Sequence, residues 1–193
     1  MNARQKRDDA GFSLVELLIS MTLFSVVLTI VGSVIVSALT AERTVREVTG
    51  STTNGQLVVN VIEETVRNST TIRVTPAADG VSTFATVRTT AGGTARCHAW
   101  FYDSTAQAVY ERTSTSAIAT PNPGAVGTEW TILSNGVVST TSAGGATLPV
   151  FAIRGTRGMT VSFAVEGESR PTSLFITSVT GRAPLANASP QCF

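Results

Sequence analysis

Two adjacent residues, Cys97 and His98, have the side chains best suited to nucleophilic or metal chemistry. A catalytic thiolate needs a neighbouring base and a zinc site needs about four ligands, but His98 is the only histidine in the sequence. Neighbouring side chains point to opposite faces of a strand, so we do not expect this pair to act together. The glycine pairs at 92–93 and 144–145 lack the Gly-Lys-Ser/Thr ending of a phosphate-binding loop. The sequence therefore predicts no catalytic site, no metal site and no cofactor, and we expect a protein that is not an enzyme.

Glu16 is the only ionisable side chain in the long apolar run from Phe12 to Leu39. At a rise of 1.5 Å per residue this run gives a helix of about 42 Å, which exceeds a hydrocarbon core of about 30 Å. An ionised carboxylate at the centre of a membrane helix costs about 2.5–3.5 kcal/mol on insertion scales. The run therefore predicts a membrane helix in which Glu16 meets a positive charge.

A short polar leader, residues 1–11, precedes the apolar run. Its basic residues Arg4, Lys6 and Arg7 predict a cytoplasmic leader and an exported C-terminal portion. A secretory signal has an apolar region of about 7–15 residues followed by a small-x-small cleavage site. The residues at 36–38 imitate such a site, but the apolar run is too long. A plain signal anchor with an incidental Glu16 is the remaining alternative.

The segment Gly11-Phe12-Ser13-Leu14-Val15-Glu16 resembles the class III signal motif of the type IV pilin superfamily. The resemblance combines a short charged leader, the Gly-Phe pair, a Glu four residues after the Phe, and a long apolar helix. It implies that a prepilin peptidase cleaves after Gly11 on the cytoplasmic side and that Phe12 becomes the N-methylated mature N-terminus. It also implies that Glu16 pairs with a terminal amine during assembly, one helical turn away or on a neighbouring subunit.

The resemblance implies a minor pilin, a structural subunit that joins or primes assembly of a type IV pilus-like filament. The alternatives are a minor pseudopilin of a type II secretion system and a competence pilin for DNA uptake. The implied partners are the prepilin peptidase, other major and minor pilins, a membrane assembly platform and the lipid bilayer. The implied location is the cytoplasmic membrane, as a single-pass protein with an exported C-terminal domain, and the cell-surface pilus. A surface enzyme held by a signal anchor is disfavoured because no catalytic constellation is apparent.

The charge balance argues against a nucleic-acid partner. The chain carries 14 basic and 13 acidic side chains, and removal of the leader takes away three bases and two acids, which leaves 11 of each. A polybasic surface is therefore not expected. The C-terminal third is mildly basic through Arg154, Arg157, Arg170 and Arg182. We interpret these arginines as a solvated sheet rim rather than a DNA-contacting face.

The helix is expected to continue past the membrane, because no proline occurs before Pro76. Residues 50–55 contain two glycines, a weak point where the helix could loosen or bend. After them, Val58, Val61, Ile62 and Val66 recur on one face, which predicts packing against a sheet.

Beyond Pro76 the pattern favours strands and turns, which gives an α+β fold: a long N-terminal helix whose second half packs on an antiparallel sheet. The expected domains are a leader at 1–11, a transmembrane and assembly helix at 12–39, its continuation at 40–75 and an exported β-rich domain at 76–193. The expected strands are 81–90, a hairpin of 95–102 with 107–113, a hairpin of 128–133 with 137–140, and a meander of 148–154, 159–166 and 172–180. Trp100, Trp130 and Tyr110 are expected in the core.

Two cysteines, Cys97 and Cys192, suffice for one disulfide in an exported domain. Both lie beyond the membrane segment, and the tail around Cys192 has little apolar surface to hold it in place. We expect a bridge that pins this tail to the strand of Cys97. Two free thiols, in a poorly oxidising envelope, are the alternative.

Overall fold

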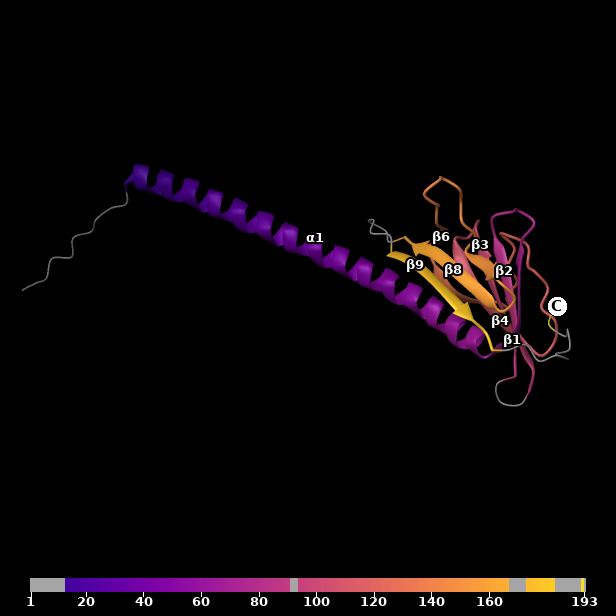
Figure 1. The fold of residues 1–193 in the computed structure, drawn as a ribbon. Helices are drawn as coiled ribbons and strands as arrows, with labels where there is room; N and C mark the ends of the chain where they lie inside the picture. The colour runs from indigo at the N-terminus through magenta and orange to yellow at the C-terminus, as the bar shows by residue number, and fades with distance from the viewer. Residues whose placement is uncertain (1–12, 91–93, 167–172, 183–191, 193) are drawn as a thin grey trace, which may run out of the picture. The chain divides into compact units, whose positions relative to one another are not determined.

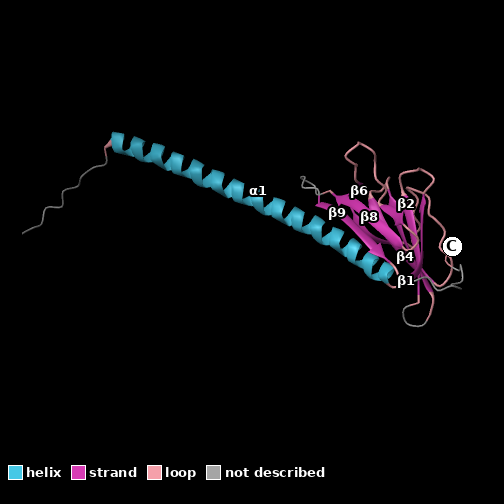
Figure 2. Cartoon of the chain, in the orientation of Figure 1, coloured by secondary structure: helices cyan, strands magenta, loops and turns pink. Residues whose placement is uncertain are grey.

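The computed structural model describes residues 13–90, 94–166, 173–182 and 192. The chain divides into two compact units with the boundary between Thr44 and Val45. One helix and nine strands lie in the described residues. Figures 1 and 2 show the long helix α1 and the strands of the β-rich part. The helix with its antiparallel sheets confirms the expected α+β class.

The helix α1 runs without interruption from Leu14 to Arg67. It passes through residues 50–55 as regular helix, so the two glycines do not break it. Asn68 and Ser69 close its C-terminus: the Asn68 side chain donates to the Glu64 carbonyl (3.0 Å) and the Ser69 hydroxyl donates to the Val66 carbonyl (2.7 Å). These bonds satisfy carbonyls that have no partner inside the helix.

The strand β1, Ser69–Pro76, corrects the expected helix continuation to residue 75. The absence of proline permitted a helix over this stretch but did not require one. The segment is rich in Thr, Ile and Val, and these β-branched side chains fit a strand better than a helix. The helix therefore ends about eight residues earlier than the sequence analysis expects.

The first sheet has five antiparallel strands in the order β1-β2-β3-β4-β5. After β1 its strands are β2 (Thr83–Thr89), β3 (Arg96–Asp103), β4 (Ala108–Ser114) and β5 (Thr131–Asn135). The expected hairpin of 95–102 with 107–113 is present as β3 and β4, which pair from Cys97 with Ser114 to Asp103 with Ala108.

The second sheet is built around β8 (Gly158–Val165), which pairs with three antiparallel neighbours. They are β6 (Val137–Ser139), β7 (Phe151–Arg154) and β9 (Ser173–Thr180). The expected meander of the last three strands is confirmed. The expected hairpin around Gly136 is wrong, because β5 pairs with β4 in the first sheet while β6 pairs with β8 in the second.

Gly136 makes the change of sheet possible. Its φ is +69°, and a Cβ added there would lie 3.0 Å from the Glu166 carbonyl oxygen. The Asn-Gly pair is thus a turn, as its sequence indicates, but the turn sends the chain from one sheet to the other.

The main core lies between α1 and the inner faces of both sheets. Val58, Ile62 and Val66 of α1 are fully buried, whereas Val61, expected on the same face, is only half-buried. The buried sheet residues of this core are Ala85, Val87, Trp100, Tyr102, Val109, Val137, Val150, Phe151, Met159, Val161, Phe163, Val165 and Val179. Packing of the second half of the helix on antiparallel sheets is therefore as expected.

A smaller core covers the opposite face of the first sheet. Phe84, Cys97, Ala99 and Phe101 from the sheet meet Ile118, Trp130 and Cys192 from the loop and the tail. Trp130 packs edge-on to Phe84, with ring centroids 6.3 Å apart. The chain thus covers this outer sheet face with its own segments.

Candidate assembly site in the N-terminal helix

Glu16 lies in the first turn of α1, three residues after Ser13. The Leu17 amide donates to the Ser13 carbonyl (3.1 Å), so the helix begins directly after Ser13. Ser followed three residues later by Glu is the spacing of a helix capping box, but among the described residues the Glu16 carboxylate makes no such bond. It does lie in the first turn, where a carboxylate meets the positive end of the helix dipole. This local signal, which the sequence analysis missed, lowers the cost of the carboxylate at this position.

The rest of the apolar run satisfies its polar groups internally. Hydroxyls donate to carbonyls three or four residues earlier at Thr22, Ser25, Thr29, Ser33 and Thr40, over 2.8–2.9 Å. The large apolar side chains from Leu14 to Leu39 are all exposed, at 48–76% of their full areas. By length and composition, α1 can cross a membrane. Lipid or other apolar helices are the surroundings that such a surface requires.

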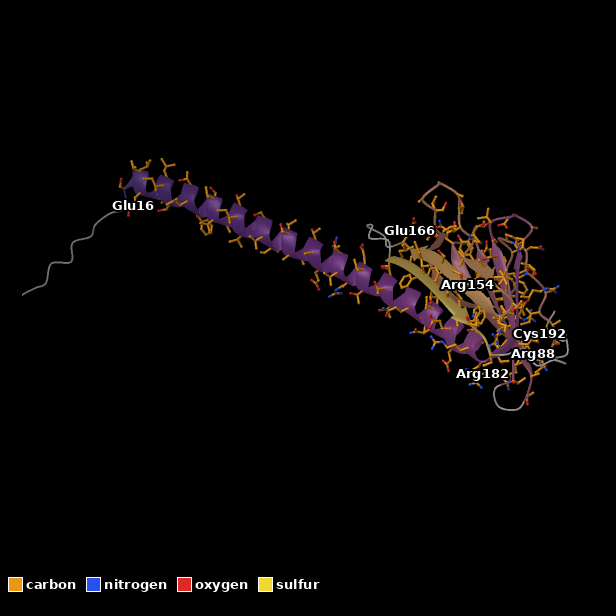
Figure 3. The ribbon with its side chains drawn as sticks, viewed as in Figure 1. Glu16, Arg88, Arg154, Glu166, Arg182 and Cys192 are labelled. Atoms are coloured by element: carbon orange, nitrogen blue, oxygen red, sulfur yellow. A yellow bond between two sulfur atoms is a disulfide. The ribbon has the colours of Figure 1, made fainter. Side chains whose placement is uncertain are left out.

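Within the part of the chain that the structure describes, the Glu16 carboxylate has no hydrogen-bond or ion-pair partner. Glu16 is labelled near the start of the helix in Figure 3. Gly11 and Phe12, the expected cleavage and methylation residues, lie outside the described residues. The site is thus a lone carboxylate at the start of an exposed apolar helix, chemically suited to receive a cation.

The second predicted site is the disulfide, and the structure joins Cys97 to Cys192 with a Cα–Cα distance of 5.4 Å. The two residues are 95 positions apart in the sequence. Cys97 is 1% and Cys192 3% exposed, so the bridge lies inside the smaller core. It pins the tail to the middle strand of the first sheet.

His98 does not share the environment of Cys97. The Cys97 side chain points into the smaller core, whereas His98 is half-buried, and its Nδ1 lies 3.3 Å from the Thr113 hydroxyl. Burial, with a contribution from the Arg96 charge, lowers the pKa of His98 below its ordinary value. The described residues contain no group of three or more His, Cys, Asp or Glu side chains placed to bind a metal ion.

A polar surface groove lies where α1 ends. Its lining residues are Asn60, Glu63, Glu64, Arg67, Asn68 and Arg182. The Glu63 carboxylate already accepts bonds from Arg67 Nη2 (2.8 Å) and from the Thr177 hydroxyl (2.5 Å). The two partners engage both oxygens of Glu63, so the Glu63 carboxylate is not free to act as a base.

The arginines expected at the sheet rim are spread over separate elements. Arg154 ends β7, Arg157 lies in the turn before β8, and Arg182 follows β9; all three are exposed. Figure 3 labels Arg154 and Arg182 at separate places in the domain. Arg170 lies outside the described residues.

Comparison with known proteins gives one match. Residues 6–32 match the family model described as the prokaryotic N-terminal methylation motif. No curated protein and no solved structure matches the chain. The matched segment covers residues 6–11 of the leader, the predicted cleavage position, Glu16 and the apolar run as far as Gly32.

The motif and the apolar helix define a membrane-anchored protein of the kind that a prepilin peptidase processes and that assembles with pilins. The N-terminal methylation motif indicates the type IV pilin and pseudopilin superfamily, to which the chain is similar over residues 6–32. The motif and the apolar helix together indicate a place in the inner membrane and the pilus. Proteins of this superfamily are generally structural subunits and not enzymes.

Proposed function

We propose that this protein is a minor pilin that joins or primes a type IV pilus-like filament after the leader is removed. The observation that carries the proposal is Glu16, the one ionisable side chain in the apolar run from Phe12 to Leu39, which lies within the methylation motif. A carboxylate in this setting is costly unless a cation meets it, and assembly supplies one.

The mechanism begins with cleavage after Gly11, which creates a cationic amine on Phe12. Glu16 then attracts the Phe12 amine of an adjacent subunit. The attraction is strong because the surroundings are apolar and do not screen the charges. The neighbouring helix also covers apolar side chains that would otherwise need lipid. Neutralising both charges in one step lets the helix pass from the bilayer into a helical bundle.

The two alternatives share this chemistry and differ in what the filament serves. A minor pseudopilin would support protein secretion, and a competence pilin would support DNA uptake. Deleting the gene and scoring surface filaments, protein secretion and DNA uptake side by side separates the three functions. We expect filament number to fall while secretion and uptake are retained.

The replacement Glu16→Leu tests the assembly role. We expect the variant to insert and to be processed but to be recovered in sheared filaments at least tenfold less than wild type, because the Phe12 amine loses its partner. Glu42→Leu, on the same helix but outside the apolar run, is the matched control and should incorporate normally. Normal recovery of Glu16→Leu in filaments would contradict the proposal.

A further inference from the structure

Arg88 is a half-buried arginine on the outer face of the first sheet. It lies on β2, directly opposite Thr71 of β1 and Cys97 of β3. Its Nε is buried without a hydrogen-bond partner, and no acidic side chain of the described residues forms an ion pair with it. A buried cationic donor without a partner costs free energy, so the arrangement requires a counter-charge that the closed structure does not supply.

The strands around Arg88 hold no other anion. The hydroxyl of Thr71 beside it is itself buried without a partner. The strands β1, β2 and β3 contain one acidic residue, Asp103, at the far end of β3, where its carboxylate accepts bonds from backbone amides over 2.8–3.3 Å. The remaining neighbour of Arg88 is the sulfur of Cys97. Figure 3 labels Arg88 and Cys192, the disulfide partner of Cys97, at the same end of the domain.

The sulfur of Cys97 changes its charge when the disulfide forms. Directly opposed residues of an antiparallel pair have Cβ atoms about 4.5–5.5 Å apart on one face of the sheet, so the side chains of Arg88 and Cys97 start side by side. In the bridge with Cys192 the sulfur is neutral. In a reduced chain it can ionise, and a neighbouring arginine favours the thiolate, which is the reactive form. A Cys97 thiolate is therefore the counter-charge that Arg88 lacks.

The other charged groups on this face leave Arg88 as the unpaired cation directly opposite Cys97. Arg112 of β4 lies two residues along the ladder from Cys97 and is bonded to the Glu129 carboxylate (3.1 Å). Arg73 lies on β1, two strands away from Cys97. The loop residues that cover the cysteine are apolar, namely Ile118 and Trp130.

We propose that Arg88 is a positioning residue for oxidation of this domain: it stabilises the Cys97 thiolate on the first sheet, so that Cys97 is the cysteine that reacts first with an oxidant. The inference goes beyond the proposed function, because it concerns closure of the bridge and not assembly through Glu16. The Nε of Arg88 is left without a partner once the bridge has removed the negative charge from Cys97.

The reaction is a pair of thiol–disulfide exchanges with a disulfide as the oxidant. The Cys97 thiolate attacks one sulfur of the oxidant, a mixed disulfide forms, and the other half of the oxidant leaves as a thiolate. The Cys192 thiol gives its proton to water and attacks the Cys97 sulfur, which forms the bridge and releases the second half. The chain loses two electrons and two thiol protons, and the oxidant is reduced to two thiols.

The first experiment measures the pH profile of Cys97 alkylation by iodoacetamide. It uses the full chain in detergent with Cys192→Ser, so that one thiol remains. We expect a midpoint below about 8.5, the ordinary pKa of a cysteine thiol, and Arg88→Gln should raise this midpoint by about one pH unit or more. Arg88→Lys keeps the charge and should retain most of the shift. Arg154→Gln, at an exposed arginine of β7, is the matched control and should leave the midpoint unchanged.

The second experiment keeps both cysteines, because Cys192→Ser removes the bridge that holds the tail. The reduced full chain is mixed with oxidised glutathione at neutral pH, and closure is followed by mass spectrometry after an acid quench. Arg88→Gln should close about threefold more slowly than wild type, because the loss of thiolate outweighs the gain in intrinsic nucleophilicity. Arg154→Gln should close at the wild-type rate. Circular dichroism checks the fold, and Arg88→Met, which keeps the apolar stem, replaces Arg88→Gln if that variant does not fold.

Equal alkylation midpoints with and without Arg88→Gln would overturn the proposal. A difference that persists in denaturant, where β2 and β3 no longer pair, would also overturn it. The Cys97→Ser chain, which retains Cys192, should show no dependence on Arg88, and an equal shift there would place the cation beside the wrong cysteine. The proposed function fails separately, when Glu16→Leu enters filaments normally.

Discussion

Gly50 and Gly55 lie on the same helix but differ in what surrounds them. A Cβ at Gly55 would overlap the Phe175 ring, whereas a Cβ at Gly50 would meet nothing within 4 Å. Gly55 therefore lets β9 approach the helix closely, and Gly50 only weakens the helix. The hydroxyl of Ser173 supports the same contact, 3.1 Å from Ser51 Oγ and 3.2 Å from Thr52 Oγ1.

This difference predicts opposite effects for the same replacement. Gly50→Ala should raise stability by about 0.5–1 kcal/mol, because alanine favours the helix. Gly55→Ala has the same helical gain, but the overlap with Phe175 should cost about 1–3 kcal/mol, giving a net loss. Thermal unfolding of the two variants beside wild type measures both shifts. Shifts of the same sign would contradict the packing role of Gly55.

Asp79 predicts a pH dependence. Burial tends to raise the pKa of its carboxyl, but hydrogen bonds from the Ser82 and Ser104 hydroxyls and from the Ser82 and Val81 amides outweigh it, so the pKa lies below its ordinary value. Such a group stabilises the fold above the pKa of the unfolded chain, about 3.9, and loses this contribution as the pH falls through the lower folded value. Because Asp79 is exposed, water screening keeps the effect small.

The comparison with Asp79→Asn checks this expectation. The variant should melt slightly below wild type at pH 7, and the gap should close as the pH falls below about 4. The Val81 and Ser82 amide signals of wild type should shift over the same range in NMR spectra. If the difference in melting temperature between Asp79→Asn and wild type did not change between pH 7 and pH 3, the ionised Asp79 carboxylate would add nothing to stability.

At the scale of elements, the alternation of apolar and polar residues and the turn residues between them predicted where most strands lie. Which strands pair with each other depended on information that the local sequence does not carry. β8 illustrates the success: Met159, Val161 and Phe163 alternate with polar or small residues and are fully buried. Its other face is also buried at Ser162 and Ala164, which are 5% and 7% exposed, so the alternation located the strand but did not indicate the burial of that face. Which neighbour covers a face is decided by segments distant in sequence.

Two further errors have the same origin. The turn at Gly136 was recognised, but only the partners β4 and β8 decide that β5 and β6 belong to different sheets. The strand β1 was placed in the helix because nothing local forbids a helix there, whereas the pairing of Ile72 with Val87 and of Val74 with Ala85 fixes it as a strand. Tertiary pairing overrides local preference in both cases.

The disulfide gives the prediction at this scale. Cys192→Ser releases the tail from the first sheet and should lower stability by several kcal/mol; chain entropy gives about 4.7 kcal/mol for a loop near 100 residues as an upper estimate. Thiol labelling of the denatured wild-type protein without reductant should find no reactive thiol. Two reactive thiols per chain, together with an unchanged melting temperature for Cys192→Ser, would refute the bridge.

At the scale of the whole molecule, the assembly site was the easier part to predict. Its chemistry is encoded in one contiguous segment, from the leader through Glu16, whose spacing is independent of tertiary packing. The roles of Gly55 and Asp79 were not predicted, because each depends on a partner from another element, Phe175 and Ser104 respectively. Asp79 is followed by Gly80, and this Asp-Gly pair is a turn signal that could have drawn attention to Asp79.

Processing is the prediction for the whole chain. The mature protein should begin at Phe12 with a methylated amine, and intact-mass measurement of membrane-extracted protein checks both features. Gly11→Ala, a small replacement, should be processed, and the matched bulky replacement Gly11→Leu should accumulate as precursor because the cleavage site excludes its side chain. Wild-type protein that retains Met1, or that starts at Leu39, would remove the pilin interpretation.

The bridge between β3 and a residue beyond β9 also orders events in time. In the export that the proposed function requires, Cys97 would leave the membrane before Cys192, because all nine strands of the described residues precede Cys192 in the chain. Until then the bridge to Cys192 cannot form, and the outer face of the first sheet lacks part of its cover. A chain that is interrupted after β9 lacks Cys192 and cannot close the bridge. On the proposed function, closure of the bridge therefore marks a domain whose chain has been exported as far as Cys192.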